Sequence, residues 1–168
     1  MSVGAPKGGT NARPLVTILM KNLNRYRLPF YELLRTELAE SGVDLRLVSA
    51  DGLSEDTAKG DSGDLEWAEH RAFKEIEIRG KTLLWQPGFD LAAKSDLIIT
   101  EQASKQLFNI VLSYGQPFFR ARHVFWGHGK NFQVSQEGES GEGLKRRLTE
   151  RAHWFLSCLL YTSPSPRD

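Results

Sequence analysis

The stretch from residue 15 to residue 51 reads LVTILMKNLNRYRLPFYELLRTELAESGVDLRLVSAD, and it predicts a strand, a helix and a second strand. Residues 15–20 form a short apolar run rich in β-branched side chains, which is typical of a buried strand. Residues 29–42 start with a proline, repeat apolar side chains at helical spacing and end in a glycine, as helices do. Residues 43–51 alternate apolar and polar side chains, which indicates a strand.

The same alternation continues along the rest of the chain. Beyond residue 51 we expect, in order, a polar loop at 52–70, two short strands around Arg79-Gly80, a helical turn at 90–96, a strand at 96–102, a helix at 103–115, a strand at 123–129, a helix at 141–153 and the start of a strand at 154–157. Strands that alternate with helices form a parallel sheet with right-handed crossovers and helices on both faces. We therefore expect an α/β, Rossmann-like domain, with parallel strands near 15–20, 43–49, 97–100 and 123–126.

Length and composition are those of one soluble globular domain. The chain has 168 residues, of which 40% are hydrophobic and 26% charged, the usual balance for such a domain. A net charge of +1 gives no whole-chain signal for nucleic-acid binding. We find neither an apolar run of membrane-spanning length nor the apolar core of a signal peptide, and residues 1–14 read as a flexible leader. The single cysteine excludes an intrachain disulfide framework and points to the reducing cytoplasm.

The last eleven residues, CLLYTSPSPRD (Cys158–Asp168), differ in character from what precedes them. All eleven match the in-frame translation of a common transposase sequencing adapter, which they resemble more closely than a native Pro/Ser-rich tail. Fusion scars do not belong in fold reasoning. On this interpretation the natural protein continues past about Ser157, the domain at 15–157 is incomplete, and Cys158 is not native.

Polar residues and glycines follow three of the predicted strands. They are Asn24, Arg25 and Arg27 after the first strand, Glu101 and Gln102 after the strand at 97–100, and Gly127, His128, Gly129, Lys130 and Asn131 after the strand at 123–126. Ligands of parallel α/β sheets bind outside the carboxyl ends of the strands. The sequence therefore predicts a binding site along this edge.

Each group in this set also has a purely structural interpretation. An arginine before a helix start can bind a phosphate or a sugar hydroxyl, but the same segment can be a solvated loop in which Asn24 caps the helix. Glu101 can accept hydrogen bonds from sugar hydroxyls, or it can be a charge in the first turn of the next helix, where Ser104 would be the cap.

His128 is the sharpest candidate. Glycines on both sides remove Cβ crowding and let the backbone turn sharply or approach a ligand closely, although a lone histidine is often structural. The four histidines show no metal-ligand spacing, so we expect no metal. The absence of G-x-S-x-G, G-x-G-x-x-G and P-loop motifs argues against a serine hydrolase, a nicotinamide enzyme and an NTPase.

Four stretches together resemble the amino-terminal half of bacterial glycosyltransferases of the family 4 type. They are NLNRYRLPFYELLRTEL, EQASKQLFN, VFWGHGKNFQ and LKRRLTERAHWFLS. The resemblance covers residues 15–157, and its most specific part is W-G-H-G-x-N in order with N-x-x-R-Y-R-x-P-F. Such enzymes have the GT-B fold, in which two Rossmann-like domains face each other across a cleft.

The resemblance implies a retaining transferase that needs no metal or other cofactor. The amino-terminal domain would bind a glycan or lipid-linked acceptor, through loops at 22–28 and 133–142, and His128 would reach the donor sugar. A second domain would hold the nucleotide-sugar donor, with a glutamate pair that has no counterpart here, so this chain alone should be inactive.

Two alternative functions, and the role of one basic segment, remain open from the sequence. The chain could belong to another GT-B relative such as a nucleotide-sugar epimerase, which would place paired carboxylates and a histidine at the cleft. It could be a non-catalytic Rossmann-like ligand-binding domain. The basic run LKRRLTER is either a solvated helix face or a peripheral contact with an anionic membrane surface, which would locate the protein at the inner face of the membrane.

Overall fold

The computed structural model describes residues 12–51, 63–78, 80–86, 88–127 and 139–157. Their centre is a six-stranded sheet in the order β3-β2-β1-β6-β7-β8, in which every neighbouring pair is parallel. The strands are β1 (Leu15–Met20), β2 (Asp44–Asp51), β3 (Glu69–Ala72), β6 (Leu97–Glu101), β7 (Arg122–Gly127) and β8 (Trp154–Ser157). The predicted Rossmann-like parallel sheet is confirmed.

The chain builds the sheet outward from its middle. From β1 it continues through β2 to β3 on one side, and it then crosses over to place β6, β7 and β8 on the other side. The order therefore reverses between β1 and β6. In doubly wound sheets the crevice at such a switch point, at the carboxyl ends of the strands, is where ligands bind.

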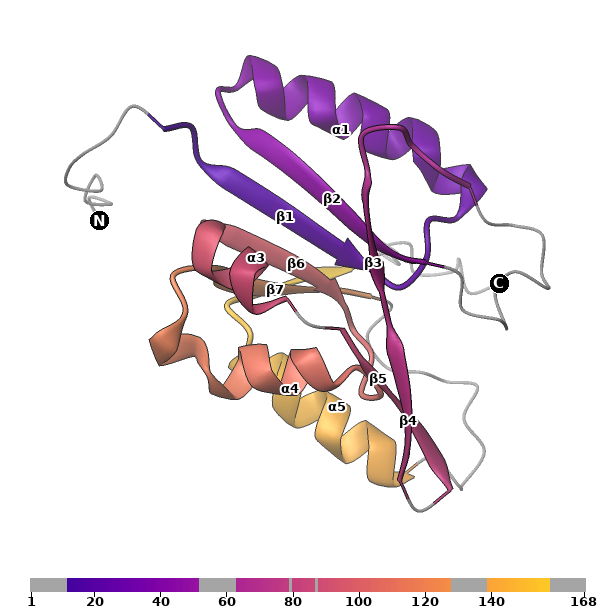
Figure 1. The fold of residues 1–168 in the computed structure, drawn as a ribbon. Helices are drawn as coiled ribbons and strands as arrows, with labels where there is room; N and C mark the ends of the chain where they lie inside the picture. The colour runs from indigo at the N-terminus through magenta and orange to yellow at the C-terminus, as the bar shows by residue number, and fades with distance from the viewer. Residues whose placement is uncertain (1–11, 52–62, 79, 87, 128–138, 158–168) are drawn as a thin grey trace, which may run out of the picture.

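Helices cover both faces, but unequally (Figure 1). The helix α1 (Leu28–Glu40) lies on one face, after the short 3-10 helix η1 (Arg25–Arg27), while α3 (Phe89–Lys94), α4 (Leu107–Tyr114) and α5 (Glu139–Arg151) lie on the other. A second 3-10 helix, η2 (Gln116–Phe118), follows α4. Gly42 joins α1 to β2 with a φ of 75°, a left-handed conformation that favours glycine.

The apolar core is split by the sheet into two clusters. Ile18 and Met20 of β1 point toward α1 with Tyr31, whereas Leu19 points to the opposite face with Phe108 of α4. Because both faces of a central parallel strand are buried, such a strand is apolar throughout rather than alternating. This explains the continuous run at 15–20.

The largest difference from the sequence prediction lies in the predicted loop at 52–70. The strand β3 begins inside it and pairs with β2 at the edge of the sheet. The sequence of β3, EHRA, is polar because an edge strand is partly solvated, and half of its side chains are exposed. The two strands expected around Arg79-Gly80 are confirmed as the antiparallel hairpin of β4 (Lys74–Ile78) and β5 (Lys81–Trp85).

Helix boundaries differ by smaller amounts. The helix predicted at 103–115 begins only at Leu107, after a turn, so Ser104 does not cap it and Glu101 is the last residue of a strand rather than a first-turn charge. The helix predicted at 141–153 spans 139–151. The last strand begins at Trp154 as predicted. Residues 1–11 of the leader and the segment 158–168 lie outside the described residues.

Candidate functional site

Glu101 bridges the two strands of the switch point. It ends β6, and its Oε2 atom accepts a hydrogen bond of 3.0 Å from the backbone N–H of Lys21, the residue that follows β1. Gln106 Nε2 lies 3.4 Å from the same oxygen. Burial raises the pKa of the Glu101 carboxyl, and the Lys21 hydrogen bond and the charge of Arg27 oppose that rise. Glu101 is thus a partly buried carboxyl group at the carboxyl edge of the sheet.

Arg27 stands beside this carboxyl group and is held by aromatic side chains. Its guanidinium carbon lies 5.0 Å from the centre of the Trp126 ring and 5.3 Å from that of Tyr26, within the range of cation–π attraction. Burial raises the pKa of Tyr31 to about 12, and the charge of Arg27 and its hydrogen bond to the phenol oppose the rise. Arg27 therefore has a fixed direction, unlike a side chain of a solvated loop.

Two buried amides support the turn that carries Glu101. Asn109 Nδ2 donates to the backbone carbonyls of Glu101 at 2.9 Å and of Ala103 at 3.0 Å. Gln106 and Asn109 are 3% and 1% exposed, and buried polar groups are normally hydrogen-bonded in this way. Sequence reasoning missed both residues, although two amides among the apolar residues of a helix start are a signal that could have been used.

Gln102 points away from the edge, contrary to its prediction as a ligand-binding residue. Its Nε2 atom donates to Thr149 Oγ1 of α5 at 2.8 Å, and its Oε1 atom is buried with no hydrogen-bond partner among the described residues. A Cβ atom at Gly127 would lie 2.7 Å from the Cβ atom of Gln102. Gly127 is therefore needed for the close approach of Gln102. The Gln102 side chain packs between Gly127 and Thr149.

The remaining predicted residues fall into two groups. Asn24 makes no side-chain cap bond, so the capping interpretation is wrong, and its Oδ1 accepts instead from Asn22 Nδ2 at 3.3 Å. Arg25 is exposed, one residue from Tyr26 on η1. His128, Gly129, Lys130 and Asn131 lie outside the described residues, directly after the end of β7 at Gly127.

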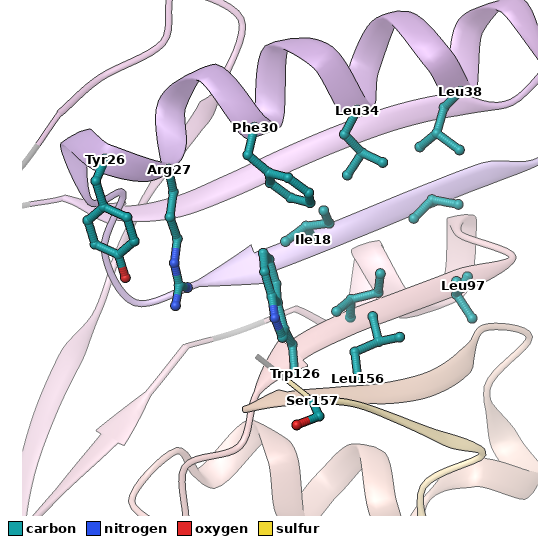
Figure 2. A pocket seen from close by; sticks show the side chains of 12 residues that line it. Ile18, Tyr26, Arg27, Phe30, Leu34, Leu38, Leu97, Trp126, Leu156 and Ser157 are labelled. Atoms are coloured by element: carbon teal, nitrogen blue, oxygen red, sulfur yellow. The ribbon is translucent and has the colours of Figure 1, made fainter. Parts of the chain in front are cut away.

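An apolar cavity of about 640 Å³ adjoins Arg27 and runs beneath α1. Its floor is formed by sheet residues such as Ile18 and Ile99, and one wall by Phe30 and Leu34 of α1. Figure 2 shows Tyr26 and Arg27 together at one end of the cavity, with Trp126 beside them. The candidate site thus combines a partly buried carboxyl group, a fixed cation and an apolar cavity. Sequence reasoning singled out the first two but not Trp126, although it lies in the W-G-H-G motif.

The described residues offer no cluster of three or more histidine, cysteine or acidic side chains that could hold a metal ion. Among the helices of the described ranges, none has both the length and the apolar character needed to cross a membrane. No protein-family model matches the chain, and no curated protein sequence matches it significantly.

Proposed function

We propose that the chain is the acceptor-side domain of a retaining glycosyltransferase that moves a sugar from a nucleotide-sugar donor to a glycan or lipid-linked acceptor. The observation that supports this most is the position of Arg27 at the switch point, close enough to Glu101 for its charge to oppose the rise in the Glu101 pKa. These two residues come from two of the motifs on which the resemblance rests, N-x-x-R-Y-R-x-P-F and EQASKQLFN. The reaction would take place in the cytoplasm or at the inner face of the membrane.

The chemistry of the two side chains fits a hydroxyl-rich ligand. A carboxylate accepts hydrogen bonds from hydroxyl groups, and a guanidinium donates up to five in a fixed planar arrangement. Since Glu101 is partly buried, a hydrogen bond to it would be stronger than the same bond in water. The segment after β1 has no glycine-rich turn, which argues against a dinucleotide cofactor at this switch point.

In this proposal His128 follows β7 and donates a hydrogen bond to the donor sugar as negative charge develops on the leaving diphosphate. Preorganised donors of this kind are usually the largest contribution to catalysis. Closure of a second domain would supply the groups that hold the diphosphate. An epimerase would need paired carboxylates at the cleft, whereas the proposed transferase needs only Glu101 on this domain.

Calorimetric titration of the chain with acceptor glycans and with nucleotide sugars tests the proposal. We expect a glycan to bind, and we expect Glu101→Gln and Arg27→Gln each to weaken binding by roughly tenfold, the value of one charge-assisted hydrogen bond. Arg35→Gln is the matched control, because Arg35 is exposed on α1 and stacks on Trp67 instead of facing Glu101. Glycan affinity that is unaffected by both site variants, or no glycan binding at all, would contradict the proposal.

A further inference from the structure

The cavity beneath α1 is a groove that is apolar along most of its length and has a cationic side chain at one end. Phe30, Leu34 and Leu38 are spaced four residues apart and form its wall, because residues at that spacing line up along one side of a helix. Leu97 continues the floor below Leu38, at the end away from Arg27, and its neighbour on β1 is Val16. The side chains that line this length are apolar, apart from Ser157 at the end of β8, until Tyr26 and Arg27 are reached.

The groove exists because the two faces of the sheet are covered unequally. Among the helices of the described residues, α3, α4 and α5 pack on one face of the sheet, whereas α1 lies on the other, here called the near face (Figure 1). Strands of parallel sheets are normally buried on both faces. On the near face Phe30 and Leu156 remain 46% and 44% exposed, so a ligand that covered them would be stabilised by the apolar area it buries.

The volume and lining of the groove favour a small apolar ligand. The volume of about 640 Å³ lies within the range of small-molecule pockets. A hydrocarbon chain fits a space lined in this way by aliphatic and aromatic side chains.

The cationic end specifies the head group of such a ligand. The guanidinium of Arg27 is held by the rings of Tyr26 and Trp126, and a guanidinium matches the geometry of a phosphate group better than any other cationic side chain. The charge of Arg27 also acts on the partly buried carboxyl group of Glu101.

We propose that this groove binds the hydrocarbon chain of a lipid phosphate, with the phosphate group at Arg27. For the transferase this names the acceptor as lipid-linked, an extension that rests on the proposed function. The lipid chain would lie under α1 and direct the head group toward the switch point, where Glu101 stands.

The test is calorimetric titration with dodecyl phosphate below its micelle concentration, beside inorganic phosphate and dodecyl maltoside. We expect dodecyl phosphate to bind at least tenfold more tightly than either. Leu34→Glu should weaken it by tenfold or more, whereas Leu33→Glu should not, because Leu33 is on the same helix but is 60% exposed and does not line the groove. Arg27→Gln should remove the preference over dodecyl maltoside, and Arg35→Gln should retain it, because Arg35 is exposed on α1, stacks on Trp67 and does not line the groove.

Further variants and outcomes keep the inference open to refutation. If Leu34→Glu fails to fold by circular dichroism, Leu156→Glu tests the same groove from the half-exposed strand β8. Equal binding of inorganic phosphate and dodecyl phosphate, or affinity unchanged by both glutamate variants, would overturn the inference. So would a dimer in sedimentation that Leu156→Glu abolishes, since a second copy would then cover the groove. None of these measurements needs a donor sugar, so loss of glycan binding with lipid phosphate binding retained would refute only the proposed function.

Discussion

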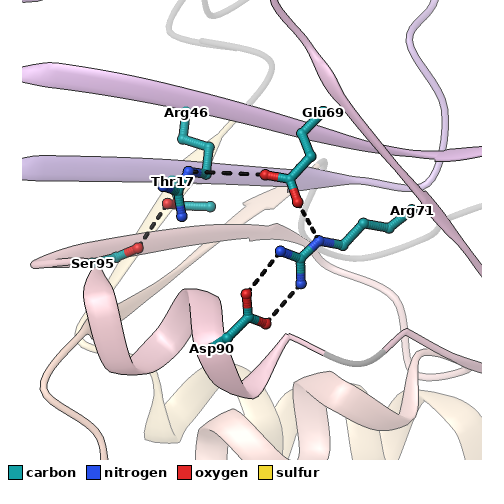
Figure 3. Close-up of polar contacts among 6 residues, drawn as sticks. All are labelled: Thr17, Arg46, Glu69, Arg71, Asp90 and Ser95. Carbon is teal, nitrogen blue, oxygen red and sulfur yellow. Dashed lines mark hydrogen bonds and ion pairs between the residues drawn. The ribbon is translucent and has the colours of Figure 1, made fainter.

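Two arginine–carboxylate groups lie in different parts of the molecule and have opposite electrostatic character. At the β3 edge, Arg71 donates to both oxygens of Asp90 at 2.7 and 2.8 Å and to Glu69 at 2.6 Å (Figure 3). The hydrogen bonds from Arg71 lower the pKa of Asp90 to about 2. At the switch point, burial instead raises the pKa of Glu101 despite the nearby charge of Arg27.

The difference separates a structural clamp from a candidate site. A carboxylate with a lowered pKa has its charge satisfied within the protein, and Arg71 thereby fixes the short edge strand β3 to α3. A buried carboxyl group with a raised pKa is under-compensated by its surroundings, and such groups are concentrated at functional sites. The same pair of residue types therefore stabilises the fold in one place and, in our proposal, faces a ligand in the other.

The largest expected effect concerns the switch-point side of this comparison. In a glycosyltransferase that contains this chain and a donor-binding domain, His128→Ala should slow transfer by tens to thousands of fold. The reason is the loss of a transition-state hydrogen bond of about 2–4 kcal/mol. This chain alone should show no transfer. A matched assay on one donor and acceptor measures both, and turnover by the chain alone, or an unaffected variant, would refute the role given to His128.

The central strands could be predicted from the sequence because burial on both faces leaves a continuous apolar run. Strands near 15–20, 97–100 and 123–126 follow from that pattern alone. The helix after the first strand follows from a different signal, the helical spacing of apolar residues within 29–42. The polar strand β3 could not be predicted, since its position depends on pairing with β2 and on the contact of Arg71 with Asp90, nineteen residues along the chain.

Only the part of the candidate site that lies at the ends of strands could be predicted from the sequence. Glu101 and Arg27 lie at the switch point because the sheet order brings the ends of β1 and β6 together. Gln102 follows Glu101 in sequence, yet its amide turns to Thr149, 47 residues away, because Gly127 leaves room for it. Contacts of that range leave no local pattern in a sequence, and the apolar groove under α1 left none either.

Acidification should destabilise the fold through a buried histidine, His123, that belongs to neither arginine–carboxylate group. Burial lowers the pKa of His123 from 6.5 to about 4, and its Nε2 atom lies 2.9 Å from Thr100 Oγ1. The unfolded chain binds the proton first, so stability is complete above about pH 6.5 and falls as the pH drops, by roughly 3 kcal/mol at pH 4. Thermal unfolding from pH 7 to pH 4.5 measures the loss.

The controls for this measurement are two histidine variants. His123→Phe should remove most of the acid sensitivity in that interval, whatever it does to stability at pH 7. His70→Gln should leave it in place, because His70 is on β3 and is bonded to Ser49 and Asp64. Equal pH dependence in all three proteins would show that His123 is not the responsible group.

Two glycines test the packing beneath the switch-point edge. Gly127→Ala would place a Cβ atom 2.7 Å from Gln102, and overpacking of this kind typically costs about 1–3 kcal/mol. Gly143 in α5 has nothing within 4 Å of the point where an alanine methyl group would lie, so Gly143→Ala should stabilise the helix by about 0.5–1 kcal/mol. Chemical denaturation of both variants measures the difference, and a neutral Gly127→Ala would show that Gln102 moves away freely.

The smallest effects test the comparison of the two arginine pairs directly, because neutralising each carboxylate should change stability in opposite directions. Asp90→Asn removes charge from a clamp that is partly exposed and therefore screened, so the expected loss is about 1 kcal/mol at pH 7. The folded pKa of Asp90 is lowered, so its contribution is complete above pH 4 and disappears as the pH falls toward 2.

Glu101→Gln keeps an oxygen for the Lys21 N–H and removes a charge that burial disfavours. Since the folded pKa of Glu101 is raised, ionisation costs stability as the pH increases, and the variant should be as stable as the parent or more so at pH 7. Urea unfolding of the two variants at pH 7 decides the matter. A loss in Glu101→Gln as large as that in Asp90→Asn would make Glu101 a second structural clamp and remove the physical basis for placing a ligand site beside it.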